Sequence, residues 1–140
     1  MLTKQELVKF FEKIFPQANF IIDKIGEKSA TIRKKINSDH LRPGGTVSGP
    51  VLMEVADLAL YVAILNEIGL VALAVTTNLN INFLRKPPSD KDIIAKCKLI
   101  KTGRTLIIGE VSLYSEGLIE PVAHAVGTYS IPPTNKTELK

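Results

Sequence analysis

Apolar and polar positions follow two different periods along this chain, and the change of period separates helices from strands. At the amino end, apolar residues recur at three- and four-residue steps, which predicts an amphipathic helix over residues 1–16 ending at Pro16. Thr3 and Glu6 have the spacing of a capping box. A second helix is predicted over residues 48–66. It is apolar nearly all the way round, which indicates burial on most of its faces.

Period-two alternation predicts the strands, the first of them over residues 28–37. In the strand that follows the second helix, one face should carry Val75, Thr77, Leu79, Ile81 and Phe83, and the other Thr76, Asn78, Asn80 and Asn82. The strands after the second helix follow one another directly, so we expect an antiparallel meander. Their predicted ranges are 73–83, 93–99, 105–115 and 118–131.

Helices that are segregated from a run of strands are typical of the α+β class. A sheet of five to six strands needs one face covered, and the apolar helix over residues 48–66 is the element able to cover it. We therefore expect one domain over residues 1–140, with an antiparallel sheet wrapped around a long central helix. Residues 133–140, which follow a proline, are expected to fray.

Composition narrows the class of protein. The 140 residues are 45 % hydrophobic, the ordinary range of a globular protein with a single core. No apolar stretch is long enough to span a membrane, and the charged amino end does not resemble a signal peptide. A lone cysteine, Cys97, argues against a disulfide framework and suits a reducing cytoplasm. We expect a cytoplasmic protein with no membrane partner.

The charge and the scarcity of certain side chains exclude two further classes. The formal charge is +4, the basic residues are scattered, and aromatic residues make up 6 % of the chain. A nucleic-acid surface would show a basic stripe interleaved with stacking aromatics, so we expect no nucleic-acid partner. With two histidines and one cysteine, a metal site made from these side chains is not expected.

The central helix holds the first candidate for chemistry. Asp57 stands inside its apolar run, and an ionised carboxylate is costly to bury without hydrogen-bond partners. Either the residue lies in a functional cleft or it reaches solvent at a subunit edge. Glu54 is three residues earlier and could share a patch with Asp57, although a solvated or salt-bridged side chain is favoured there.

The start of the same helix, Ser48-Gly49, is the second candidate. Unpaired N–H groups and the positive end of the helix dipole stabilise an oxygen that gains negative charge. A glycine also lets a ligand approach the backbone. An oxyanion hole at the Gly49 N–H would suit hydrolysis of a thioester, whereas simple capping by Ser48 would need no function.

Three stretches of the chain follow a known pattern: GGTVSGPVLMEVADLALYVAI, TTNLNINFLRKP and KTGRTLIIGEVSLYSEGLIEPVAHAVGTYSI. They resemble the hotdog-fold thioesterases, in particular the phenylacetic-acid-pathway (PaaI-like) type, and the resemblance covers about residues 28–132. The shared elements are a glycine at the start of the central helix, an acidic residue eight positions later, a strand ending in Arg-Lys-Pro and a Gly-Arg turn. The resemblance implies the hotdog fold and hydrolysis of an acyl-coenzyme A (acyl-CoA) thioester.

The resemblance also implies three catalytic residues. The Gly49 N–H would polarise the thioester carbonyl, and Asp57 would act as general base or as nucleophile. Thr76 would help to place the attacking water. In this family Gly49 and Asp57 of one site would come from opposite subunits of a homodimer, and dimers of dimers are common.

Six further residues are expected to contact the substrate: Ser48, His40, Tyr61, Arg85, Lys86 and Arg104. The last three align with positions that contact the nucleotide end of CoA in relatives, although ordinary surface charge also explains them. Many relatives have a histidine where this chain has Ser48. His40 from the preceding loop could replace its contacts, although a lone histidine in a loop is more often incidental. Tyr61 is a candidate for an acyl pocket or for plain core.

The leading interpretation is therefore hydrolysis of acyl-CoA, with CoA as part of the substrate and no separate cofactor. Because this chain has Ser48 before Gly49 where many relatives have a histidine, a non-catalytic acyl-CoA binder or sensor is the first alternative. A hydratase or dehydratase ranks lower, because relatives with that activity pair their carboxylate with a histidine. A purely structural dimer would leave Asp57 unexplained. The acyl group is not predicted.

Overall fold

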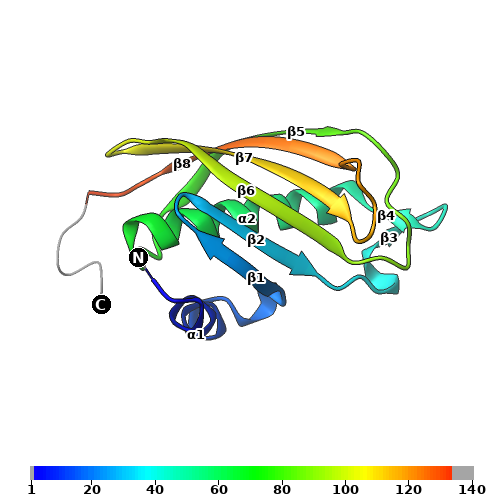
Figure 1. Ribbon diagram of the computed structural model, residues 1–140, viewed down its shortest axis with the longest axis horizontal. Coiled ribbons are helices and arrows are strands. Elements are labelled where there is room, and N and C mark those ends of the chain that lie inside the picture. Colours follow the sequence, from blue (N-terminus) through cyan, green and yellow to red (C-terminus); the bar gives the residue numbers. More distant parts are fainter. Residues whose placement is uncertain (1, 134–140) are drawn as a thin grey trace.

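A computed structural model describes residues 2–133, and it shows an antiparallel sheet wrapped around one long helix (Figure 1). The sheet has six strands in the order β1-β2-β6-β7-β8-β5, and β3 and β4 form a separate small pair. The elements in chain order are α1 (Lys4–Ile14), η1 (Pro16–Ala18), β1 (Ile21–Gly26), β2 (Ser29–Lys34), η2 (Ser38–His40), β3 (Leu41–Arg42), β4 (Thr46–Val47), α2 (Gly49–Ile68), β5 (Val75–Phe83), β6 (Ile93–Thr102), β7 (Leu106–Ser115) and β8 (Ala123–Ser130).

The predicted α+β architecture is confirmed, including the sheet of five to six strands and the central helix. The tail predicted to fray lies outside the described residues from position 134 onward. Within residues 2–133, no helix is both long enough and apolar enough to cross a membrane.

Helix α1 begins at a capping box, as predicted. The Glu6 N–H donates to Thr3 Oγ1 at 3.2 Å, and the Thr3 N–H donates to Glu6 Oε1 at 3.0 Å. The helix lies beside β1 (Figure 1) and buries Leu7 and Phe11. The Phe11 ring meets the Tyr61 ring edge-on, with 5.4 Å between centroids, so α1 is attached directly to the central helix.

Helix α2 is buried as its composition predicts. Every residue from Leu58 to Asn66 is buried. The sheet supplies the surrounding apolar surface, and β6 turns Ile93, Ala95, Cys97 and Leu99 inward, as its alternation predicts. Removal of this surface from water is the main stabilising term of the fold.

Two glycines let α2 sit close to the sheet. Gly109 in β7 pairs directly with Gly127 in β8, and Leu60 of α2 lies over both. A Cβ atom at Gly127 would lie 2.4 Å from Leu60 Cδ1, and one at Gly109 would lie 2.7 Å from Leu60 Cδ2. Glycine within a strand is typical of such a close approach. The contact sets both the depth and the rotation of the helix.

Two expectations about the sheet are wrong. The sequence pattern predicts no strand over residues 21–26, but β1 lies there. The apolar alternation of this segment is weak: Ile22 alone is buried in β1, and the pairing with β2 shifts just after it. The predicted meander holds for β6, β7 and β8 but fails for β5, which pairs with β8. Both sides of β6 are already occupied, by β2 and β7, so β5 lies at the opposite edge of the sheet.

A bulge in β5 also changes which residues face the helix. Thr76 pairs with Tyr129 and Asn78 with Thr128, so Thr77 is an extra residue in the strand. Thr76 bonds to α2, and Leu79 also faces α2, close to Gly127. Strict alternation places Thr76 and Leu79 on opposite faces. The bulge overrides it and brings a polar side chain inward.

We expect Gly127→Ala to lower the free energy of unfolding by about 1–3 kcal/mol, because the added methyl group collides with Leu60. Leu60→Ala alone should cost about 2–5 kcal/mol, through loss of buried contacts. In the double variant the small side chain at position 60 leaves room for the methyl group. The double variant should therefore lose clearly less free energy of unfolding than the two single variants lose in sum. Urea unfolding of the four proteins measures this, and strict additivity would contradict the contact.

Candidate active site

Asp57 is half-buried on the face of α2 that looks toward β5 and β8. Its Oδ1 atom accepts two hydrogen bonds, from Thr76 Oγ1 at 2.6 Å and from the Tyr129 hydroxyl at 2.8 Å. The Tyr129 hydroxyl also lies 3.1 Å from the main-chain carbonyl oxygen of Asp57. Within residues 2–133, Oδ2 accepts no hydrogen bond and is not enclosed. Oδ1 is thus held in place by two hydroxyl groups, whereas Oδ2 is free to contact a bound molecule.

A cleft of about 500 Å³ opens beside this carboxylate. Its polar lining comes from Asp57, Thr76, Tyr129 and Gln17. The rest of the wall is mainly apolar or aromatic: Ile14, Phe15, Tyr61, Ala72, Ala74 and Val75. A concave, largely apolar space with a few convergent polar groups is the usual form of a small-molecule site.

Tyr129 is the functional candidate that the sequence pattern does not reveal. It lies on the inward face of β8, two residues after Gly127, and is buried. Burial, and next the charge of Asp57, raise the pKa of the Tyr129 phenol well above its ordinary value. The phenol therefore stays protonated and donates to the carboxylate at neutral pH. The sequence could have indicated Tyr129 in one way: a tyrosine on the inward face of a strand needs a hydrogen-bond partner for its hydroxyl.

Tyr61 supports Tyr129 from the helix. The two rings are stacked with centroids 5.9 Å apart, and the Tyr61 hydroxyl donates to the Ala72 carbonyl at 2.9 Å. Burial raises the pKa of Tyr61 too. The residue lines the cleft and belongs to the core at once, whereas Leu60, its neighbour in α2, is core alone.

The second candidate region is the start of α2. Ser48 has the backbone conformation of an N-cap, but its side chain makes no capping bond within the described chain, so simple capping does not explain it. Instead the Ser48 N–H donates to the His40 carbonyl at 2.9 Å. A Cβ atom at Gly49 would lie 3.2 Å from the Phe83 ring, so a larger residue would crowd the aromatic side chain.

Asp57 and Gly49 of one chain do not form a single site. They are eight residues apart in one helix, which separates them by about 12 Å along its axis. His40, Ser48, Arg85 and Lys86 belong to the Gly49 end, where the Val47 N–H donates to the Pro87 carbonyl. Thr76, Tyr61 and Tyr129 belong to the Asp57 end.

Of the predicted substrate contacts, His40 and Arg85 already bond within the chain, whereas Lys86 and Arg104 are exposed. The His40 ring accepts a hydrogen bond from the Asn37 N–H at 2.9 Å and caps η2. Arg85 donates to the Pro121 carbonyl and pairs with Glu120, both at 2.7 Å. Lys86 and Arg104 are exposed. Arg104 lies in the turn between β6 and β7, far along the sheet from Arg85.

Glu54 does not share a patch with Asp57. It turns toward β2, where its Oε1 atom lies 3.6 Å from Lys34 Nζ. The salt-bridged interpretation of this residue is therefore confirmed. Asp57 is the sole carboxylate that lines the cleft among the described residues.

Other reactive side chains lie away from the cleft. Burial, with a smaller effect of the Glu110 charge, raises the pKa of the Cys97 thiol to about 12, so the nucleophilic thiolate is absent at neutral pH. His124 pairs with Glu110 at 3.2 Å between β8 and β7. No group of three or more His, Cys, Asp or Glu side chains within residues 2–133 is arranged to hold a metal ion.

A family model described as the thioesterase superfamily matches residues 44–122, which contain α2, β5, β6 and β7 and, among the candidate residues, Gly49, Asp57 and Thr76. The chain belongs to the thioesterase superfamily. Membership supports thioester hydrolysis as the general reaction and agrees with the hotdog architecture. No curated protein matches the sequence.

Solved structures give the same fold for this thioesterase-superfamily chain. A protein from Silicibacter sp. TM1040, whose thioesterase name is provisional, is 44 % identical with a TM-score of 0.88, over 95 % of this chain and 94 % of that one. The Escherichia coli PaaI protein from the phenylacetic acid degradation operon is 19 % identical with a TM-score of 0.76, over 91 % and 94 %. A hypothetical thioesterase from Streptococcus pneumoniae, solved with coenzyme A, is 21 % identical with a TM-score of 0.73, over 84 % and 92 %.

We expect Cys97 to resist alkylation in the folded protein, because the buried thiol keeps its proton at pH 8. Iodoacetamide should leave the native chain unmodified and should label it fully in denaturant. Mass spectrometry at several times measures both states. Rapid labelling of the native protein would contradict the buried position of Cys97.

Proposed function

We propose that this chain hydrolyses acyl-CoA thioesters in a homodimer, with Asp57 as the catalytic carboxylate. The observation that supports this most directly is the pair of hydroxyl bonds to Oδ1, which orients the carboxylate and leaves Oδ2 open to the cleft. A carboxylate that only stabilised the fold would gain from having both oxygens satisfied.

The chemistry needs one base or nucleophile and one oxyanion donor. In the first route, Oδ2 of Asp57 takes a proton from water while the water oxygen attacks the thioester carbonyl carbon. In the second route, Oδ2 attacks that carbon itself, and water then hydrolyses the mixed anhydride. In both, the carbonyl oxygen becomes an oxyanion, the C–S bond breaks, and CoA leaves as a thiolate that is protonated to the thiol.

Thr76 and Tyr129 have a positioning role in this scheme. Each donates its hydroxyl hydrogen to Oδ1, so the carboxylate plane cannot rotate freely. The Thr76 oxygen keeps lone pairs that can accept a hydrogen bond from the attacking water. Such preorganisation removes reorganisation from the reaction step itself.

The oxyanion donor comes from a second subunit in this proposal, because Gly49 of the same chain is about 12 Å from Asp57 along the helix. Strand β5 is an edge of the sheet, and its apolar residues Val75 and Phe83 are exposed in the single chain. Antiparallel pairing of two β5 edges would place the Thr76 end of one beside the Phe83 and Gly49 end of the other.

The same pairing suits a CoA substrate. Within one chain, Arg104 and the Arg85–Lys86 pair belong to opposite ends of β5, whose nine residues span roughly 26 Å. Two antiparallel copies would bring Arg104 of one toward Arg85 and Lys86 of the other, beside each cleft. Clustered basic side chains suit the phosphates of CoA. The Streptococcus pneumoniae structure with coenzyme A supports a ligand of this type.

We expect Asp57→Asn to lower kcat for acyl-CoA hydrolysis by about a hundredfold to ten-thousandfold, the usual contribution of a positioned base. Thiol release from a panel of acyl-CoA substrates measures the rate, and thermal unfolding tests the fold. Glu67→Gln is the matched control, because this carboxylate is in the same helix but does not line the cleft. It should keep its rate.

A near-normal rate for Asp57→Asn would contradict the catalytic assignment. Saturable binding of acyl-CoA without thiol release by the wild-type protein would identify a non-catalytic binder instead.

We expect subunits with complementary defects to restore activity. Gly49→Val should block the oxyanion site through Phe83, and Asp57→Asn should remove the carboxylate. A mixed dimer keeps one intact site, so random mixing of equal amounts should recover about a quarter of the wild-type rate. Thiol release after coexpression measures this. No recovery, with mixed dimers confirmed by mass spectrometry, would contradict a shared site.

A further inference from the structure

We propose that Ile14, Phe15 and Gln17, where α1 meets η1, form the acyl-binding wall of the Asp57 cleft, and that Phe15 determines the longest acyl group that fits. This inference rests on the proposed thioesterase function. It assigns a role to a part of the chain that lies outside the residues matched by the family model, 44–122.

The first observation is the lining of the cleft. Ile14, Phe15 and Gln17 contribute to the same space as Asp57, although they lie about 40 residues away in sequence. Asp57 is its sole charged lining residue among those described. An acyl group with its carbonyl carbon near Asp57 would therefore have uncharged, mainly apolar surface along its tail. This suits an aliphatic or aromatic acyl chain.

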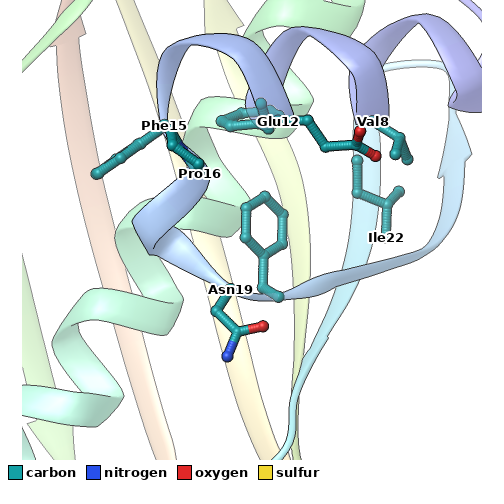
Figure 2. A pocket seen from close by; sticks show the side chains of 8 residues that line it. Val8, Glu12, Phe15, Pro16, Asn19 and Ile22 are labelled. Atoms are coloured by element: carbon teal, nitrogen blue, oxygen red, sulfur yellow. The ribbon is translucent and has the colours of Figure 1, made fainter.

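The second observation is a further hollow of about 240 Å³ on the other side of Phe15. It lies under α1, with Val8, Phe11, Phe20 and Ile22 among its walls. Figure 2 shows Glu12 and Val8 on α1 above it, and Phe15 leaving the chain on the side away from Val8 and Ile22. Phe15 lines both spaces. Phe15 is therefore the residue that the two spaces share.

The third observation is that this wall is held in place. Lys34 of β2 is buried, and its ammonium donates to the Ala18 and Asn19 carbonyls, both at 2.9 Å. Glu54 Oε1 lies 3.6 Å from the same atom. A buried lysine is rare unless its charge is satisfied, and here the partners are the end of η1 and the central helix. Lys34 is therefore a positioning residue for the wall.

Helix α1 also ends at the wall. The Phe15 N–H donates to the Phe11 carbonyl at 2.8 Å, and the following Pro16 prevents the helix from continuing. Phe11 itself packs on Tyr61 and Phe20, with ring centroids 5.4 Å and 5.1 Å apart. The backbone of Phe15 is thus fixed from both sides. Its half-buried side chain packs against the core and lines the cleft, so it takes up space that a longer acyl chain would need.

The test measures kcat/KM for straight-chain acyl-CoA substrates from two to sixteen carbons, together with the affinity for their non-hydrolysable thioether analogues. We expect Phe15→Ala to join the two spaces and to shift the optimum to longer chains, with a gain of about tenfold or more for substrates longer than the wild-type optimum. Rates for the shortest substrates should change little. Lys34→Met should loosen the wall and broaden the chain-length profile.

Phe10→Ala is the matched control, because Phe10 is an aromatic residue of α1 that lines neither space. It should leave the chain-length profile unchanged. An unchanged optimum in Phe15→Ala, or an equal shift in Phe10→Ala, overturns the inference. If no substrate is hydrolysed but Phe15→Ala shifts analogue affinity toward longer chains, the proposed function fails and the acyl wall stands.

Discussion

The contact of Leu60 with the paired glycines Gly109 and Gly127 sets the position of the central helix. With any side chain at those two strand positions, α2 would lie farther from the sheet or rotate about its axis. Asp57 is three residues before Leu60 and so shares its face of the helix. Tyr129 is two residues after Gly127 and so shares its face of the sheet. The packing that closes the core therefore also brings Asp57 to Tyr129.

The same arrangement explains why an ionisable side chain is tolerated beside the core. Asp57 receives two hydroxyl donors on one oxygen, while its other oxygen reaches the cleft. Full burial would have required partners for both oxygens. The bulge at Thr77 supplies one of the donors by turning Thr76 inward, at an edge strand where bulges are common. The site thus depends on an irregularity in the sheet and not on the regular strand.

The correct sequence predictions concern features with a local cause. The capping box at Thr3, the buried central helix and the inward face of β6 follow from periodicity over a few residues. The incorrect ones concern pairing. The partner of β5 could not be read from the chain, because either edge of β8 or β6 offers the same hydrogen-bonding groups to an antiparallel strand. Weak alternation concealed β1, which packs on α1.

For the candidate site, the sequence by itself determined that a carboxylate stands in an apolar helix eight residues after a glycine at its start. Those are properties of one continuous segment with a regular rise per residue. The tertiary structure alone decided that Tyr129 and Thr76 share one oxygen of Asp57 and that Phe15 borders the cleft. These are distances between segments far apart in sequence. They depend on how deeply Leu60 settles between two strands, which no local pattern encodes.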